Sequence, residues 1–210
     1  MNVNFESSKT LAIEGSVMLL LSLIPYVGWV LGIVGVVLLL RSMKEFSNYY
    51  QDEKIYQDSL TGVKYYVIAI IAAAVAIAAF TVGIWSATGF TSTFVLTAAF
   101  GVGLIAFIVG LVVAFVFYIL ASTHLKRTFN ALAQKTGEGS FTTAGTLLWI
   151  GSILTIVGVG LILIFISWIF ATIAFSAIKP QQYQQYNPQQ SGYGYAQTPT
   201  QPVQAKSSQL

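Results

Sequence analysis

The sequence predicts an all-α integral membrane protein of about six short transmembrane helices, paired as three helical hairpins and followed by a disordered C-terminal tail. Hydrophobic residues make up 56% of the 210-residue chain and charged residues only 8%, whereas about a quarter of the residues in a soluble domain are charged. The apolar residues form three long blocks, and the lysines and arginines flank these blocks. Both patterns are typical of helices that lie in lipid.

The first apolar block, from Glu14 to Lys44, is too long to cross a bilayer once. A helix of that length reaches about 45 Å, against a hydrocarbon core of about 30 Å. Pro25 removes a backbone donor and Gly28 permits a tight turn, so we predict a helical hairpin with segments at about 8–24 and 29–42. Because the first segment reaches only about 25 Å, a re-entrant hairpin that dips into the membrane remains an alternative.

Small residues in the second segment predict close helix packing. Gly28, Gly32 and Gly35 lie on neighbouring turns, where the missing side chains let another helix approach the backbone. We interpret this pattern as ordinary packing rather than as a dimerisation surface, and the sequence leaves a homo-oligomer open. The polar stretch 43–62 follows, and apolar residues at helical spacing predict that it is ordered on the aqueous side.

The central block predicts the second hairpin, with segments at about 63–87 and 93–122. No side chain between Tyr65 and Leu125 carries a formal charge, and the turn between the two segments is short and uncharged. The later segment reaches about 45 Å, which is long enough for it to tilt or to project into water.

The last block, from Thr142 to Ile178, is again too long for one crossing, and Gly158 and Gly160 mark its turn. The predicted segments are 142–157 and 160–178. A shift of 130 residues brings four residues of the first block onto identical residues of the last block, which is weak evidence for parallel repeats around the central hairpin. These residues are Gly15, Ser22, Val27 and Gly28.

The predicted transmembrane domain covers residues 1–179, and a tail covers residues 180–210. The tail consists mainly of Gln, Tyr, Pro and Gly, a composition that cannot build a packed core. We therefore expect the tail to be disordered.

The positions of the basic residues predict the topology. Lys9, the stretch from Arg41 to Lys64, the stretch from Lys126 to Lys135, and Lys179 all fall on one side of a three-hairpin arrangement, and the three turns carry no charge. The positive-inside bias makes that side cytoplasmic, so we expect a protein of the cell membrane with both termini in the cytoplasm and six segments that cross or dip. The net charge of +3 then reflects topology, and nucleic acid is not an expected partner.

Glu14 is the one carboxylate inside an apolar segment, and a turn near Val27 brings it to the depth of Arg41. We predict an intramembrane ion pair between Glu14 and Arg41. A proton or cation site is the weaker alternative, because one acid without a second buried acid or histidine makes a poor relay.

The sequence shows no pattern of an enzyme. The chain has no cysteine and one histidine, His124, and it lacks the clusters of Cys, His and acids that metal sites require. We therefore predict no catalytic residue, no metal and no cofactor. An enzyme that acts on lipid at the interface through His124 and the Lys126-Arg127 pair has the least support.

Several stretches of the chain resemble a family of mainly archaeal integral membrane proteins, known as domain of unknown function 996. They are K-T-L-A-I-E-G-S, S-L-I-P-Y-V-G-W-V-L-G-I-V-G, T-A-G-T-L-L-W-I-G-S-I-L-T-I-V-G and A-T-I-A-F-S-A-I-K-P. The resemblance covers about residues 5 to 180. It implies a membrane topology, and it implies no activity, cofactor or catalytic residue.

Two functions remain open on these grounds. The first is a structural or scaffolding membrane protein, held by the lipid bilayer, whose cytoplasmic tail binds a protein partner. The alternative is a small-solute or ion transporter or channel, built from the two similar hairpins, in which broken helices expose backbone groups.

Overall fold

The computed structural model describes residues 5–22, 24, 26–88 and 93–180 of the chain. Across these residues the structure is helical and contains no strand, so the predicted all-α class is confirmed. All of the helices belong to one compact unit, Met1–Lys179. The predicted disordered tail covers residues 180–210, and all of it after residue 180 lies outside the described residues.

The described part of the chain contains six α-helices, and a short 3-10 turn (Thr155–Val157) precedes the last of them. Four helices, α3 to α6, are long and apolar enough to cross a membrane. The helices are α1 (Phe5–Leu21), α2 (Gly28–Tyr50), α3 (Glu53–Thr88), α4 (Thr93–Thr136), α5 (Ser140–Leu154) and α6 (Gly160–Ala177).

Helix α2 continues through most of the polar stretch that follows the first hairpin. Met43, Phe46 and Tyr50 are buried, so the apolar stripe of the helix persists for two turns beyond the predicted membrane segment. Gln51, with φ of 51°, ends the helix. The carboxylate of Asp52 then accepts a hydrogen bond from the backbone N–H of Lys54 at 3.1 Å, which caps the start of α3.

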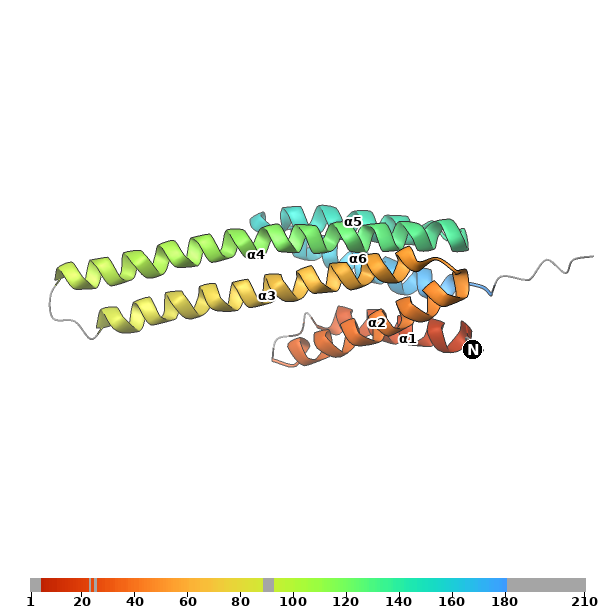
Figure 1. The fold of residues 1–210 in the computed structure, drawn as a ribbon, viewed down its shortest axis with the longest axis horizontal. Coiled ribbons are helices and arrows are strands. Elements are labelled where there is room, and N and C mark those ends of the chain that lie inside the picture. Colours follow the sequence, from red (N-terminus) through yellow and green to blue (C-terminus); the bar gives the residue numbers. More distant parts are fainter. Residues whose placement is uncertain (1–4, 23, 25, 89–92, 181–210) are drawn as a thin grey trace, which may run out of the picture. The chain divides into compact units, whose positions relative to one another are not determined.

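The six helices contact one another in cyclic order, so that α1 packs on α2, α2 on α3, and so on until α6 packs on α1 (Figure 1). Helices α3 and α4 extend well beyond the turns of the two short hairpins, α1–α2 and α5–α6 (Figure 1). In this extension small residues let α3 and α4 pack closely: Gly103 lies against Gly83, and Gly110 lies against Ala76.

Interhelical hydrogen bonds from hydroxyl groups join five of the neighbouring helix pairs. Hydroxyls of this kind contribute on average about 0.6 kcal/mol each in membrane proteins, so together they favour one arrangement of the ring. The bonds are Ser42 Oγ to Ser8 O at 2.8 Å, Ser59 Oγ to Thr128 Oγ1 at 3.1 Å, Ser122 Oγ with Ser152 Oγ at 2.7 Å, Ser167 Oγ to Ala144 O at 2.7 Å, and Thr172 Oγ1 to Ser16 Oγ at 3.0 Å.

One end of the ring is filled by four phenylalanines, which we call the aromatic plug: Phe46 of α2, Phe129 of α4, Phe141 of α5 and Phe175 of α6. All four are at most 1% exposed. The ring of Phe175 lies 4.9 Å from Phe141, 6.2 Å from Phe46 and 6.3 Å from Phe129, measured between centroids. The plug therefore ties four helices together at the end of the ring where the charged residues lie.

Candidate functional site

The ring of helices encloses a cavity of about 280 Å³. Every one of the six helices contributes to its wall, so the cavity exists only when the whole ring is assembled. Its lining residues are Leu19 and Ser22 of the α1 end, Val36 and Leu39 of α2, Val63 and Tyr66 of α3, Tyr118, Ala121, Ser122 and Leu125 of α4, Leu148 of α5, and Leu161, Ile164 and Trp168 of α6.

The cavity runs from the aromatic plug to the turns of the short hairpins. At its floor, Trp168 packs edge-on against Phe129 of the plug, with ring centroids 6.2 Å apart. At its other end, Ser22 follows the last residue of α1 and Leu161 is the second residue of α6. Beyond that level only α3 and α4 continue (Figure 1).

The cavity wall is chemically suited to an apolar guest. Among the described lining residues none is charged. The hydroxyl of Ser22 donates to the backbone oxygen of Leu19 at 2.6 Å, and that of Ser122 bonds to Ile119 O and to Ser152. The hydroxyls of Ser22 and Ser122 are thus engaged, whereas Tyr66 and Tyr118 also bring phenol groups to the lining. Among the described lining residues no nucleophile is paired with a base.

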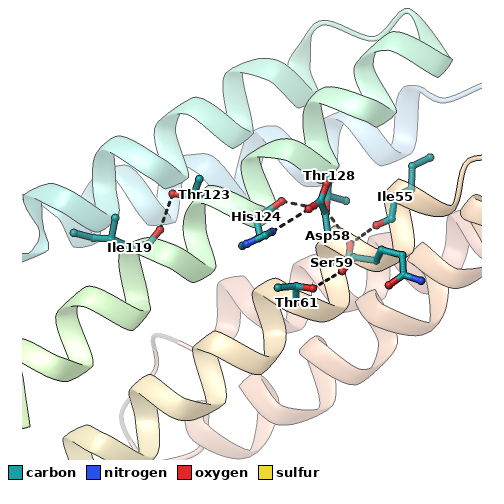
Figure 2. Close-up of polar contacts among 9 residues, drawn as sticks. Ile55, Asp58, Ser59, Thr61, Ile119, Thr123, His124 and Thr128 are labelled. Atoms are coloured by element: carbon teal, nitrogen blue, oxygen red, sulfur yellow. Dashed lines mark hydrogen bonds and ion pairs between the residues drawn. The ribbon is translucent and has the colours of Figure 1, made fainter.

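A polar cluster joins α3 to α4 near the charged end of the ring (Figure 2). Nδ1 of His124 lies 2.9 Å from Oδ1 of Asp58, and both side chains are partly exposed. Beside this pair, the hydroxyl of Ser59 bonds to Ile55 O and to the hydroxyl of Thr128 (Figure 2). Since the Ser59 hydroxyl is engaged with those groups, the cluster ties two helices together and lacks the nucleophile–base contact of a hydrolase.

The sequence prediction did not find Asp58, the partner of His124. A signal for it exists in the central hairpin, because an antiparallel hairpin places residues at equal distance from its turn opposite each other. Residues 58 and 124 each lie 33 positions from residue 91, whose number falls between the end of α3 and the start of α4. Folding the sequence about that point pairs the single histidine with the aspartate.

The predicted ion pair between Glu14 and Arg41 does not form in the structure. Arg41 lies 3.8 Å from Glu45 on its own helix, Glu14 is exposed, and no ion pair joins Glu14 to Arg41 among the described side chains. The reason is the rotation of α1. Gly15 faces α2, and its neighbour Glu14 points about 100° away from that direction, because successive residues of a helix are rotated by this angle. The prediction matched the depth of the two residues and ignored their direction.

The structure places the predicted turn glycines in two different roles. Gly28 begins α2 and Gly160 begins α6, and in both cases a Cβ would collide with backbone atoms of the preceding helix or turn. Gly158, with φ of 81°, lies in the turn itself, in a conformation that favours glycine. Pro25, the other predicted turn residue, lies outside the described residues.

The predicted packing glycines lie at the contact between α1 and α2. A Cβ at Gly35 would lie 2.9 Å from the backbone oxygen of Gly15, and one at Gly32 would lie 3.3 Å from Cβ of Ser22. The sequence prediction did not assign Gly15 to this contact, although a Cβ there would lie 2.9 Å from the backbone nitrogen of Leu39. Glycine thus faces glycine across the hairpin.

Two of the basic residues that the sequence analysis names make contacts with other helices. Nζ of Lys126 lies 4.5 Å from the ring centroid of Trp149 on α5. Nζ of Lys9 donates to the backbone oxygen of Ile178 at 2.9 Å, which satisfies a carbonyl at the C-terminal end of α6. Within the described ranges, no three His, Asp or Glu side chains gather as a metal site would require.

Comparisons with known proteins identify relatives of unknown function. The profile of the family described as "Protein of unknown function (DUF996)" matches residues 31–169. An uncharacterised protein of Methanocaldococcus jannaschii is 29% identical over 166 residues, which cover 78% of this chain and 89% of that protein. No solved structure matches the chain.

Proposed function

The chain belongs to the DUF996 family of proteins of unknown function, and we propose that it is a non-catalytic, multi-pass protein of the cell membrane that acts as a scaffold at the cytoplasmic surface. The observation that carries this proposal is the interior of the ring. It holds an aromatic plug and a mainly apolar cavity, and the serine hydroxyls of the cavity wall are bonded to backbone or to another serine. Such an interior favours a structural role over a path for ions or a reaction site.

The placement in the membrane follows from α3. Tyr65 and the exposed Trp85 are about 20 residues, or about 30 Å, apart, which matches the thickness of the hydrocarbon core. Tyr and Trp favour the two interfaces of a bilayer. If the hydrocarbon layer were shifted toward the N-terminal end of α3, it would bury the charges of Lys64 on α3 and of Lys126 and Arg127 on α4, at a high cost in free energy.

With this placement, the short hairpins enter only part of the bilayer. Gly145 of α5 packs on the backbone of Lys126, and Ser152 bonds to Ser122. From the level of Ser152 the chain rises only about 9 Å more before the turn at Gly158. Although α5 and α6 have the length of a crossing, their contacts with α4 support a re-entrant arrangement.

A scaffold role fits this asymmetry. Six helices lie together at the charged end, and only two continue through the rest of the membrane, so the protein offers a broad surface on one side. The positive-inside bias favours the cytoplasm for that side. The hydrogen bond from Lys9 to Ile178 supports the same compartment for the start of α1 and the end of α6. We propose that the Gln/Tyr/Pro-rich tail leaves from this surface and binds a cytoplasmic protein.

A truncation after Lys179 tests the scaffold role. Proteins cross-linked in native membranes to the full chain should be lost from the truncated chain. They should also be lost from a full-length variant whose tail tyrosines are replaced by serine, and both variants should remain in the membrane. An unchanged set of cross-linked proteins would contradict the role of the tail.

The cavity shared by all six helices is the specific observation that favours the alternative, a transporter or channel. The plug closes the cavity at the charged end, so this function requires Phe46 and Phe175 to separate during a cycle. Reconstituted liposomes that show a flux of protons, cations or small solutes above that of empty liposomes would support transport. A flux equal to that of empty liposomes would contradict a transport function.

A further inference from the structure

The cavity inside the ring has a depth, a wall and two unequal ends, and together these identify the kind of molecule that fits it. We propose that it holds part of one hydrocarbon chain of a membrane lipid. This inference rests on the membrane placement given under Proposed function. It assigns a ligand to a site for which the family and the relatives supply none.

The cavity lies at the edge of the hydrocarbon layer in the proposed placement. Tyr66 and Tyr118 line the part on the uncharged side of Lys64 and of the basic residues of α4, whereas Val63 and Leu125, which are next to Lys64 and Lys126, line the part nearer the charged end. Lipid chains therefore surround the end of the cavity near Tyr66 and Tyr118. The plug, whose phenylalanines are at most 1% exposed, lies at the other end.

The two ends of the cavity differ in a way that admits a chain. The floor is closed by Trp168 against Phe129. At the opposite end, four of the six helices stop and only α3 and α4 go on (Figure 1). In the proposed placement this end of the ring borders the hydrocarbon layer, from which the end of a lipid chain can enter.

The wall explains why the cavity would be filled by a chain. Apolar cavities stay free of water and bind apolar guests, because water finds too few hydrogen-bond partners in them. An empty cavity also forfeits the dispersion contacts of its lining atoms. The hydroxyls of Ser22 and Ser122 are satisfied by their own helices and by Ser152, so they need no hydrogen bond from a guest. The phenol groups of Tyr66 and Tyr118 belong to a wall that is otherwise mostly apolar.

Fluorescence of Trp168 provides a direct readout, because this side chain lines the cavity and is only 7% exposed. The protein used is the full chain with Trp29, Trp85 and Trp149 replaced by phenylalanine, reconstituted in phosphatidylcholine vesicles. The lipids carry bromine at defined positions along one chain. We expect a loss of Trp168 fluorescence that is largest with bromine near the chain end.

A matched pair of variants separates a guest in the cavity from lipid around the protein. Val36→Phe fills the cavity from α2, and its neighbour Val37→Phe, at a position 60% exposed, adds the same bulk to the outer surface. Quenching should be lost in the first and kept in the second. Val63→Phe, which fills the cavity from α3, repeats the test if Val36→Phe lowers the melting temperature.

The outcomes distinguish the inference from the placement on which it rests. Fluorescence that no bromine position quenches, or that Val36→Phe and Val63→Phe leave equally quenched, would overturn the lipid chain as occupant. Quenching by aqueous acrylamide would overturn it too, because the cavity would then contain water. Quenching that is largest with bromine next to the headgroup would keep the chain in the cavity and contradict the proposed membrane placement.

Discussion

At the scale of single residues, the packing of the helices depends on glycines, which have no side chain. Gly15 and Gly35 face each other across the first hairpin, and the backbone of one helix lies where a Cβ of the other would be. The sequence predicted Gly35 from its spacing with Gly28 and Gly32. It could not assign the opposite residue, because the spacing within one helix does not reveal the rotation of its neighbour.

Gly35→Ala should lower the stability of the fold. The added Cβ would lie 2.9 Å from the oxygen of Gly15, so the hairpin must open, and we expect a loss of about 1–3 kcal/mol. Thermal unfolding in detergent measures the loss. Gly101→Ala is the matched control, since nothing lies within 4 Å of a Cβ there. Equal melting temperatures for the two variants would contradict the close packing of α1 on α2.

Tyr50 makes the stability depend on alkaline pH. It lies at the charged end of α2, outside the predicted membrane segment, and burial, together with the neighbouring Tyr49, raises the pKa of its phenol to about 12. Its buried hydroxyl finds no hydrogen-bond partner among the described residues. A raised pKa means that folding favours the protonated form. This contribution is therefore complete below the unfolded pKa of about 10 and is lost as the pH rises from there toward 12.

Tyr50→Phe should remove this pH dependence. At neutral pH the variant should be more stable by about 1 kcal/mol, because no polar group is left buried without a partner. Denaturant unfolding between pH 7 and 11 should show a gap between variant and wild type that widens above pH 10. Tyr26→Phe, at a position 95% exposed, is the control. A gap of constant size would contradict the buried phenol.

At the scale of elements, the sequence predicted the breaks between helices better than the ends of the helices at the aqueous side. The turns at Gly28 and Gly158 follow from local backbone chemistry, which a sequence displays directly. The extension of α4 to Thr136 depends on the burial of Phe129 and Leu132 against other helices, which no single segment reveals. Depth was predicted for the Glu14 and Arg41 pair, but direction around the helix was not.

The contact between α3 and α4 at Asp58 and His124 can be measured by a double-mutant cycle. Asp58→Asn, His124→Gln and the double variant should show a coupling free energy of about 1 kcal/mol, because the two groups lie 2.9 Å apart but remain partly exposed to solvent. Thermal unfolding of the four proteins supplies the values. Effects that add without coupling would mean that the pair does not contribute to the packing of the hairpin.

The aromatic plug links helices that are distant in the chain, and the ring of Phe175 contacts the rings of the other three plug residues. Phe175→Ala should therefore cost about 3–5 kcal/mol of stability. Phe165→Ala on the same helix, at a position 43% exposed, should cost much less in detergent. If the two substitutions cost the same, the plug does not hold the ring together.

At the scale of the whole molecule, the account depends on the uneven lengths of the three hairpins. The sequence predicted three hairpins and left open whether the first and last apolar blocks span the membrane as hairpins, dip into it, or cross it once. Hydropathy cannot decide this, because a half-buried hairpin and a complete one are equally apolar. The contacts of Gly145 with Lys126 and of Ser152 with Ser122 support the shallow alternative, because they fix α5 against the charged end of α4.

The cysteine-free chain allows this claim to be tested by single cysteines at Tyr26, Val159, Thr88 and Asp52. A maleimide that cannot cross the membrane is applied to each side of intact vesicles, and denatured protein serves as the control in which all four cysteines react. The account predicts that Asp52→Cys reacts from the cytoplasmic side, Thr88→Cys from the opposite side, and Tyr26→Cys and Val159→Cys from neither side. Reaction of Tyr26→Cys or Val159→Cys from the same side as Thr88→Cys would contradict it, because the short hairpins would then cross the bilayer completely.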